Sequence, residues 1–192
     1  MKIPSQAKRV FKGKIFDVYQ WEQQMFDGSH ETFEMLKRPD TVQIIATGDE
    51  KIFIAKEQQP NRTEPYLTLF GGRVDDGEEP LAAAKRELLE EAGMTTNDWE
   101  LWCTKEPASK IEWTVYTFIA RGCKQTHAQC LDAGEKITLH EVNLDEFVTN
   151  ATHPSFRNLG ITWELLRLQL EPKKLEEFKK KLFISPHPPL QQ

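Results

Sequence analysis

The chain has 192 residues, with 25 Lys or Arg against 30 Asp or Glu, so its formal net charge is −5 when the histidines are neutral. That length suits one domain, or one domain with a small appendage, and 39% apolar residues are enough to form a core. No apolar run reaches the roughly 18 residues of a membrane helix, and the lysine-interrupted N-terminus lacks the apolar stretch of a secretory signal. Three scattered cysteines are too few for a disulfide framework or a zinc site, which indicates a reducing, cytoplasmic location. The acidic balance argues against a nucleic-acid partner, which would need a basic surface on the protein.

The first third of the chain is predicted to form strands. Two of them flank Asp27-Gly28, a dipeptide that favours a tight hairpin turn because it tolerates positive φ. A third contains Val42, Ile44 and Ile45 in close succession, so we expect it to be buried on both faces. The predicted strands cover residues 14–24, 30–37, 41–47, 51–56 and 66–70.

The rest of the chain mixes strands and helices. A helix is expected over 79–92, because Pro80 suits a first turn and Gly93 suits a helix end. A lysine-rich C-terminal helix carries an apolar stripe that includes Phe178 and Leu182, and we expect this stripe to pack on the domain rather than bind a membrane or RNA. Further strands are predicted at 99–104, 111–120 and 136–142, further helices at 144–150, 155–170 and 172–184, and a frayed end at SPHPPLQQ. Mixed strands with outer helices predict an α/β or α+β sandwich.

Acidic residues cluster in the segment from Gly72 to Met94. On a helix that turns 100° per residue, Glu87, Glu90 and Glu91 lie within about 100° of one another, and like charges at helical neighbour positions repel by roughly 0.2–0.5 kcal/mol per pair. Such a pattern alone is usually a solvated acidic face. This one lies near a helix C-terminus, where the macrodipole already disfavours anions, and it follows a double glycine that lets backbone approach a ligand. Clustered carboxylates and backbone carbonyls suit Mg²⁺.

The segment resembles the Nudix box, G-x5-E-x7-R-E-U-x-E-E-x-G-U, in which U is a bulky apolar residue. The matching residues are Gly72, Glu78, Arg86, Glu87, Leu88, Glu90, Glu91, Gly93 and Met94. This resemblance implies an α/β/α sandwich around a mixed sheet, with an N-terminal β-hairpin extension and C-terminal helices. It also implies a set of ligands for two or more Mg²⁺ or Mn²⁺ ions, which are Glu87, Glu90, Glu91 and the Gly72 carbonyl. Arg86 would orient the carboxylates with Glu78 as its partner, and the reaction would be hydrolysis of a nucleoside diphosphate linked to another moiety.

The flanks of the box resemble the ADP-ribose and ADP-sugar pyrophosphatase branch of this family. In that branch an acidic loop after the box supplies the catalytic base, and Glu135 lies where that loop is expected, while Glu91 is the alternative base. Arg62 and Arg73 flank the strand that enters the box and are candidates for binding a terminal phosphate. The Pro-Ala-Gly segment that usually precedes the box in this branch is replaced by Phe70-Gly71-Gly72. The sequence therefore does not determine the nucleobase or the sugar of the substrate.

Aromatic residues near the box offer a surface on which a nucleobase could stack, although strand aromatics more often fill a sheet face. They are Tyr66, Phe70, Trp113 and Tyr116.

Two other functions stay open. A (d)NTP pyrophosphatase is typically shorter than this chain, and a catalytically silent, nucleotide-sensing Nudix module typically lacks box carboxylates, which are all present here. By resemblance we expect a homodimer that takes a nucleotide-type small-molecule substrate, with no nucleic acid and no membrane as partner. The expected domains are an N-terminal β-strand extension over 1–40 that could mediate dimerisation, a Nudix hydrolase domain over 41–170, and a C-terminal helix with a frayed tail over 171–192.

Overall fold

The computed structural model describes residues 2–184, apart from the side chain of Leu159. The strands are β1 (Lys8–Lys12), β2 (Asp17–Gln24), β3 (His30–Lys37), β4 (Thr41–Gly48), β5 (Lys51–Gln58), β6 (Tyr66–Thr68), β7 (Met94–Thr95), β8 (Asp98–Lys105), β9 (Ile111–Glu112), β10 (Val115–Arg121), β11 (Lys124–Gln125) and β12 (Lys136–Val142). The helices are α1 (Pro80–Ala92), α2 (Leu144–Ala151), α3 (Leu159–Gln169) and α4 (Pro172–Phe183).

A six-stranded mixed sheet forms the centre of the molecule. Its order is β12-β5-β4-β10-β8, with β6 added beside β5. The central strands β4 and β10 run parallel, in a register that pairs Thr41 with Val115 and Ala46 with Ala120, and the other neighbours are antiparallel. Ile44 and Ile45 are both fully buried, which confirms the prediction that β4 is covered on both faces.

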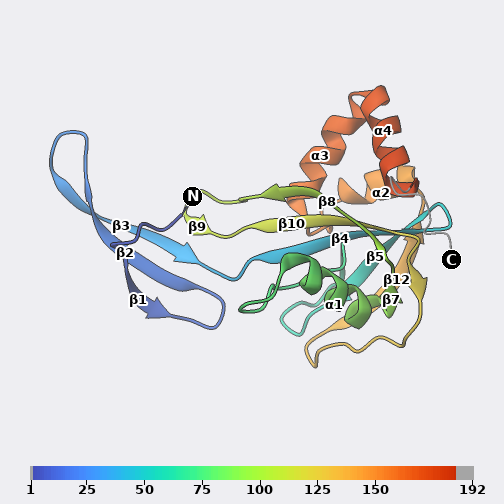
Figure 1. The fold of residues 1–192 in the computed structure, drawn as a ribbon, viewed down its shortest axis with the longest axis horizontal. Coiled ribbons are helices and arrows are strands. Elements are labelled where there is room, and N and C mark those ends of the chain that lie inside the picture. The colour runs from blue at the N-terminus through green and yellow to red at the C-terminus, as the bar shows by residue number, and fades with distance from the viewer. Residues whose placement is uncertain (1, 185–192) are drawn as a thin grey trace.

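Helices cover both faces of this sheet, as Figure 1 shows, with α1 on one side and α2, α3 and α4 on the other. Because side chains alternate along a strand, Ile44 packs with Leu88 of α1, whereas Ile45 packs with Phe147 of α2 and Leu182 of α4. The predicted α/β/α sandwich with C-terminal helices is therefore confirmed.

The N-terminal strands form a separate four-stranded sheet, β1-β2-β3-β9, that projects from the body in Figure 1. The hairpin predicted at Asp27-Gly28 is present, and Gly28 has a φ of 87°. The strand predicted over 14–24 is present as β2 but begins three residues later, at Asp17, because the chain turns where the Gly13 N–H bonds to the Phe16 carbonyl at 3.0 Å. Strand β1, which was not predicted, lies before that turn and is exposed along its whole length, so its sequence carries no alternating apolar signal.

Other predicted boundaries also differ from the structure, and one short strand pair was not predicted. The strand predicted over 111–120 is interrupted at Thr114, whose N–H donates to the Asp40 carboxylate at 2.7 Å instead of to a neighbouring strand. The helix predicted from residue 155 begins at Leu159, after a turn in which the Phe156 N–H bonds to the His153 carbonyl. The short pair β7–β11 carries too few residues for a periodic signal. The frayed end predicted at SPHPPLQQ lies outside the described residues.

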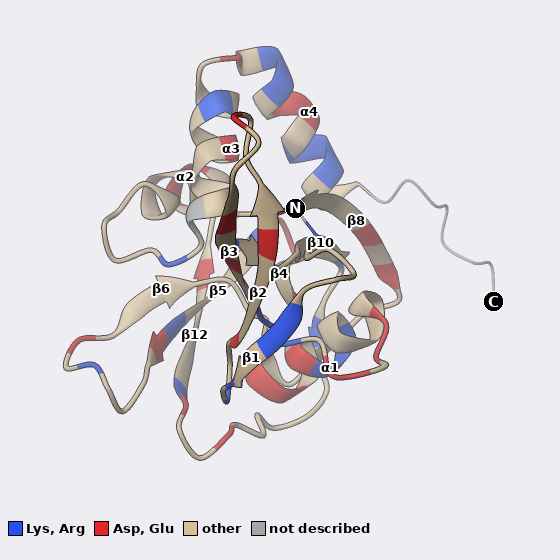
Figure 2. Cartoon of the chain, turned by 90° about the vertical axis from the view of Figure 1, so that its left-hand side faces the viewer, with Lys and Arg blue, Asp and Glu red and all other residues tan. Residues whose placement is uncertain are grey.

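The apolar stripe of α4 packs on the domain as predicted, with Phe178 and Leu182 buried. Figure 2 shows both basic and acidic residues along this helix. None of the helices described in residues 2–184 is long and apolar enough to cross a membrane.

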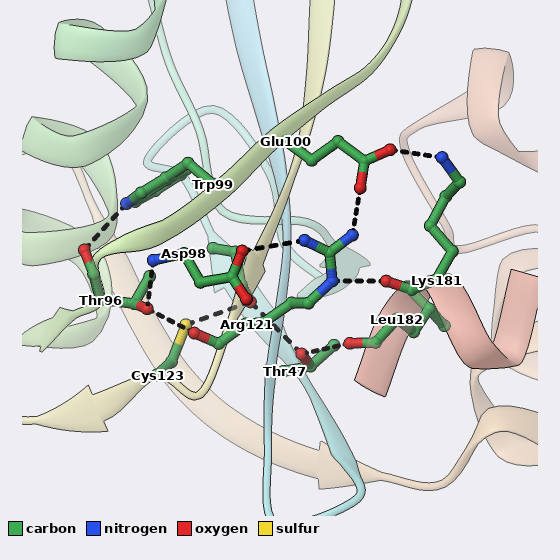
Figure 3. A network of polar contacts seen from close by, with 10 residues as sticks. Thr47, Thr96, Asp98, Trp99, Glu100, Arg121, Cys123, Lys181 and Leu182 are labelled. Carbon is green, nitrogen blue, oxygen red and sulfur yellow. Dashed lines mark hydrogen bonds and ion pairs between the residues drawn. The ribbon is translucent and has the colours of Figure 1, made fainter. Parts of the chain in front are cut away.

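A polar network fixes the end of α4 to the sheet, as drawn in Figure 3. The Arg121 guanidinium, of which 4% is exposed, forms ion pairs with Asp98 and Glu100 and donates to the backbone carbonyl of Lys181. The Thr47 hydroxyl donates to the Leu182 carbonyl at 2.8 Å. These bonds satisfy carbonyl groups that a helix end leaves without partners.

Candidate active site

Helix α1 is shaped by the residues at its two ends. Pro80 occupies the first turn, and Gly93 ends the helix with a φ of 65° and donates its N–H to the Leu89 carbonyl at 2.9 Å. A Cβ atom at Gly93 would lie 2.1 Å from the backbone oxygen of His127, so only glycine fits there. Ala83, Ala84, Leu88 and Ala92 face the core. The neighbouring face lines a cavity with Arg86, Glu87, Glu90 and Glu91.

This cavity has a volume of about 480 Å³ and lies between α1, the glycine turn, the end of β5 and the loop before β12. Its lining consists of Glu57, Gln59, Gly71, Gly72, Arg73, Asp75, Arg86, Glu87, Glu90, Glu91, Cys130, Asp132 and Glu135. Carboxylates far outnumber the two arginines, so the cavity is strongly acidic. We call it the carboxylate cavity.

Arg86 is the centre of a hydrogen-bond network along one wall. Its guanidinium binds both oxygens of Glu78, at 3.2 and 3.0 Å, and reaches Glu87 at 2.8 Å and Glu90 at 3.1 Å. It also donates to the Arg73 carbonyl at 3.0 Å, which ties the helix to the chain after the glycine turn. The hydrogen bond from Arg86 lowers the pKa of Glu78, and the same bond raises the pKa of Arg86. The structure thus places Glu78 and Arg86 together, as the resemblance implied.

Glu91 is the most deeply buried carboxylate of the cavity, with 5% of the residue exposed. The Gly71 N–H donates to its Oε2 atom at 2.7 Å. Burial raises the pKa of Glu91 well above its ordinary value despite this bond, which acts in the opposite direction. Neighbouring negative charges raise it further, and they belong to Glu87, Glu135 and Glu57. Neutralising this group therefore requires a proton or a cation.

The two glycines of the turn are needed for different reasons. Gly71 has a φ of 145°, and a Cβ atom there would lie 2.1 Å from the Val42 carbonyl oxygen. At Gly72 a Cβ atom would lie 2.2 Å from the Glu87 carboxylate. The first glycine lets the turn pack on β4, and the second leaves space for a carboxylate of the site.

The residues of the cavity fit a divalent cation, although they do not form a complete cage. In the part of the chain that the structure describes, no group of three His, Cys, Asp or Glu side chains is arranged to hold a metal ion. Glu87 and Glu90 turn toward Arg86, and Glu91 turns toward the Gly71 N–H. The oxygen donors, the buried negative charge and the space beside Gly72 nevertheless match the needs of a hard cation. The Gly72 carbonyl accepts the Val42 N–H at 2.9 Å and keeps a second lone pair.

The structure brings both candidate bases into this cavity. Glu135 lies in the loop before β12, where its own N–H donates to the Asp132 carbonyl at 2.9 Å. Burial raises the pKa of Glu135, and nearby carboxylates add to the effect. Burial raises the pKa of Glu87 as well.

The two candidate phosphate-binding arginines are separated. Arg73 lines the carboxylate cavity, whereas Arg62 lies outside it, with its guanidinium 5.3 Å from the centre of the Tyr66 ring. Tyr66 and Phe70 are buried, as expected for strand aromatics, and Trp113 is only partly buried.

Glu57 is a residue of the cavity that the sequence interpretation missed. It is 9% exposed, and its carboxylate accepts a hydrogen bond from the Gln59 amide at 2.8 Å. It pairs across the strands with Tyr66, whose pKa is raised by burial and by hydrogen bonding to Glu57. The sequence does hold one signal for Glu57, which is a single acidic residue in an otherwise apolar strand. Its neighbour Lys56 points outward, so Glu57 faces inward, where an acidic residue is unusual.

Comparison with known proteins identifies the family. Residues 37–159 match the NUDIX domain. The chain belongs to the Nudix family. It is accordingly a hydrolase of phosphoanhydride bonds, in a family whose members generally use divalent metal ions, and the fold and family predicted from the box are confirmed.

Three relatives of this Nudix protein show how far the similarity extends. A methanol dehydrogenase activator from Bacillus methanolicus is 26% identical over 144 residues, which cover 73% of this chain and 77% of the relative. An ADP-ribose pyrophosphatase from Bacillus subtilis (strain 168) is 33% identical over 89 residues, or 46% of this chain and 48% of the relative. A crystal structure of an ADP compounds hydrolase matches with a TM-score of 0.70 over 88% of this chain and 94% of that one, and at 20% identity it shows the shared fold.

Proposed function

We propose that this Nudix hydrolase is a Mg²⁺-dependent pyrophosphatase that cleaves a nucleoside diphosphate linked to another moiety, of the ADP-ribose or nucleotide-sugar type. The products are a nucleoside monophosphate and a phosphorylated second product. The observation that carries the proposal is the buried Glu91 carboxylate, which shares one cavity with Glu87, Glu90 and Glu135. Similarity to an ADP-ribose pyrophosphatase supports the substrate class.

Each side chain of the cavity has a distinct role in this proposal. Glu87, Glu90 and Glu91, with the Gly72 carbonyl, would hold two or more Mg²⁺ ions, for which Mn²⁺ could substitute. Bound cations would neutralise the diphosphate and make an attacking water more acidic. Arg86 positions the carboxylates through its hydrogen bonds to Glu87 and Glu90.

The reaction exchanges one phosphorus–oxygen bond for another. The water oxygen forms a bond to one phosphorus atom, and the bond from that phosphorus to the bridging oxygen breaks. Glu135 accepts the proton of the water, with Glu91 as the alternative acceptor. The bridging oxygen leaves on the second phosphate, so both products are phosphomonoesters.

A substrate panel tests this function. We would incubate the protein with Mg²⁺ and ADP-ribose, ADP-sugars, GDP-sugars, dinucleotides or NTPs, and identify the released monophosphates. We expect turnover of diphosphate-linked compounds that EDTA abolishes and Mg²⁺ restores. A strong preference for NTPs would support the alternative (d)NTP pyrophosphatase, and absence of turnover on every compound would support a nucleotide-sensing module.

We also propose that the chain forms a homodimer in the cytoplasm through the N-terminal strands of residues 1–40. Apolar residues there are exposed, among them Val10 at 53% and Phe11 at 60%. The three free cysteines support a reducing location. Light scattering on the Val10→Ser/Phe11→Ser variant tests the dimer, because a mass that is unchanged from wild type would exclude this interface.

A further inference from the structure

The loop between β11 and β12 is hydrogen-bonded to the C-terminal end of α1 and leads into Glu135. The last turn of a helix leaves carbonyl groups without partners inside the helix. Residues of the loop supply such partners here. The Thr126 N–H donates to the Gly93 carbonyl at 2.9 Å, and the Cys130 N–H donates to the Glu90 carbonyl at 2.8 Å. Backbone bonds therefore join the helix that carries the acidic box residues to the loop that carries Glu135.

The side-chain amide of Gln129 connects this helix to β12 as well. Its Nε2 atom donates to the backbone carbonyl of Glu91, and it also donates to the backbone carbonyl of Ile137 at 3.5 Å. An amide nitrogen carries two hydrogens, so one group can serve both carbonyls. Gln129 is therefore a bridge between the last turn of α1 and the start of β12.

Both of these carbonyls lie close in the chain to a candidate base. One belongs to Glu91 itself, whose carboxylate accepts the Gly71 N–H at 2.7 Å at the other end of the residue. The other belongs to Ile137, which follows Glu135 by two residues, and Glu135 lines the carboxylate cavity. The Gln129 amide therefore sets the distance between the backbone of Glu91 and the chain that follows Glu135.

The bonds that Glu135 makes itself shape its turn without attaching it to α1. The Glu135 N–H donates to the Asp132 carbonyl at 2.9 Å, and the Asp132 N–H donates to the Glu135 carboxylate at 3.3 Å. The negative charges of Glu57 and Glu90 lie near the Glu135 carboxylate and repel it. The turn thus needs an attachment outside itself to stay beside the cavity, and the Gln129 bridge supplies one.

We propose that Gln129 is a positioning residue that holds Glu135 at the catalytic site by bridging α1 and β12. The proposal rests on the function proposed above, in which Glu135 accepts the proton of the attacking water. Gln129 is not part of the cavity lining, so it acts through Glu135. Proton transfer requires the base to lie within hydrogen-bonding reach of the water. A displaced Glu135 should therefore slow the reaction without changing how the substrate or the cations bind.

Steady-state kinetics of Gln129→Met test this role on the best substrate of the panel. Methionine keeps the length of the side chain and removes the amide donors. We expect kcat to fall on the order of tenfold, while KM and the Mn²⁺ affinity stay within about twofold of wild type. Gln125→Met is the matched control, because Gln125 is an exposed glutamine on β11. Unchanged kcat in Gln129→Met, or a loss that appears only in KM, would overturn the proposal.

A double-mutant cycle separates positioning of the base from a general loss of structure. If Gln129 acts through Glu135, the Gln129→Met substitution should lower kcat in the wild-type background and have no further effect in the Glu135→Gln background. Two losses that multiply in the double variant would overturn the proposal, because Gln129 would then act on another group. Unchanged kcat in Glu135→Gln alone would overturn it as well.

Hydrogen exchange tests the bridge without relying on activity. In the metal-free protein, amides of residues 130–136 should exchange on the order of tenfold faster in Gln129→Met than in wild type. Amides of α1 should keep their wild-type rates, because the apolar face of this helix is packed in the core. Unchanged exchange in residues 130–136 would overturn the proposal whether or not the protein hydrolyses any diphosphate. Faster exchange in a protein that is inactive on the whole substrate panel would support the bridge and refute the proposed function instead.

Discussion

The N–H of Gly71 donates to the carboxylate of Glu91 at 2.7 Å, which joins the glycine turn to the last turn of α1 across 20 residues of sequence. This bond places a buried carboxylate at the floor of the carboxylate cavity. The Nudix box is therefore one structural unit, in which the glycine turn is hydrogen-bonded to α1 and α1 carries the carboxylates of the cavity.

Replacing Glu91 by Gln should abolish most activity without unfolding the protein. The amide keeps the size of the side chain and removes a buried negative charge that neighbouring carboxylates disfavour. We expect kcat/KM to fall on the order of a thousandfold, since a cation ligand is lost, while the melting temperature of the metal-free protein stays the same or rises. Glu176→Gln, on the exposed surface of α4, is the control. Near wild-type turnover of Glu91→Gln would refute the assigned role.

Alanine substitutions of the two glycines of the turn should have different consequences, because one should lower stability and the other should lower activity. In Gly71→Ala the new Cβ atom meets backbone at 2.1 Å with a positive φ, so we expect a loss of at least about 3 kcal/mol in the free energy of unfolding. In Gly72→Ala the Cβ atom meets the end of the Glu87 side chain, which can rotate away. That variant should fold and lose activity. Denaturant unfolding combined with kinetics checks both, and a stable, active Gly72→Ala protein would contradict the geometry.

Glu135→Gln decides between the two candidate bases. If Glu135 accepts the proton, kcat should fall by about 10²–10⁴-fold, and Mn²⁺ affinity, measured by calorimetry, should stay within about twofold of wild type. Unchanged kcat would assign the proton transfer to Glu91. Asp132→Asn, in the same loop, controls for a general effect of removing negative charge.

The sequence predicts the elements whose ends are fixed by local chemistry. The helix that carries the box was predicted within one residue, because Pro80 and Gly93 determine its ends by their own conformations. The hairpin at Asp27-Gly28 was predicted for the same reason. In contrast, β1 is fully exposed and turns at Gly13 through a bond to Phe16, so no periodic pattern marks it.

Site residues that depend on distant contacts were harder to predict. Glu87, Glu90 and Glu91 share a cavity because they share a helix, which the spacing reveals. Glu57 reaches the carboxylate cavity through the pairing of its strand with Tyr66, and this contact leaves no sequence motif. Arg62 was expected near a phosphate because it flanks the strand that enters the box. It lies outside the carboxylate cavity, with its guanidinium 5.3 Å from the centre of the Tyr66 ring, and its role stays a prediction.

Removing the charge of Arg121 should detach the C-terminal helix. Arg121→Gln leaves the Asp98 and Glu100 carboxylates without their shared partner and weakens the bond to the Lys181 carbonyl. We expect about 3 kcal/mol lower free energy of unfolding, with faster hydrogen exchange in α4 than in α1. Lys181→Gln, which removes only a partly exposed pair to Glu100, should cost under about 1 kcal/mol. Equal effects of the two substitutions would show that the buried guanidinium is not the anchor.

The buried thiol of Cys123 should make stability fall at alkaline pH. Burial raises the pKa of Cys123 from 9.0 to about 12 in the folded protein. Because the pKa is raised in the folded state, the buried neutral thiol makes its full contribution to the free energy of unfolding below pH 9.0. That contribution is lost progressively as the pH rises toward about 12. Cys123→Ala removes the titrating group, so the unfolding free energy of this variant should depend less on pH in this window. Its unfolding free energy should be lower than that of wild type below pH 9.0, because removal of the sulfur atom leaves a small cavity. Cys130→Ala is the control, since it removes an exposed thiol instead of the buried one. Parallel curves for wild type and Cys123→Ala between pH 9.0 and 11 would show that the thiol is not protected by burial.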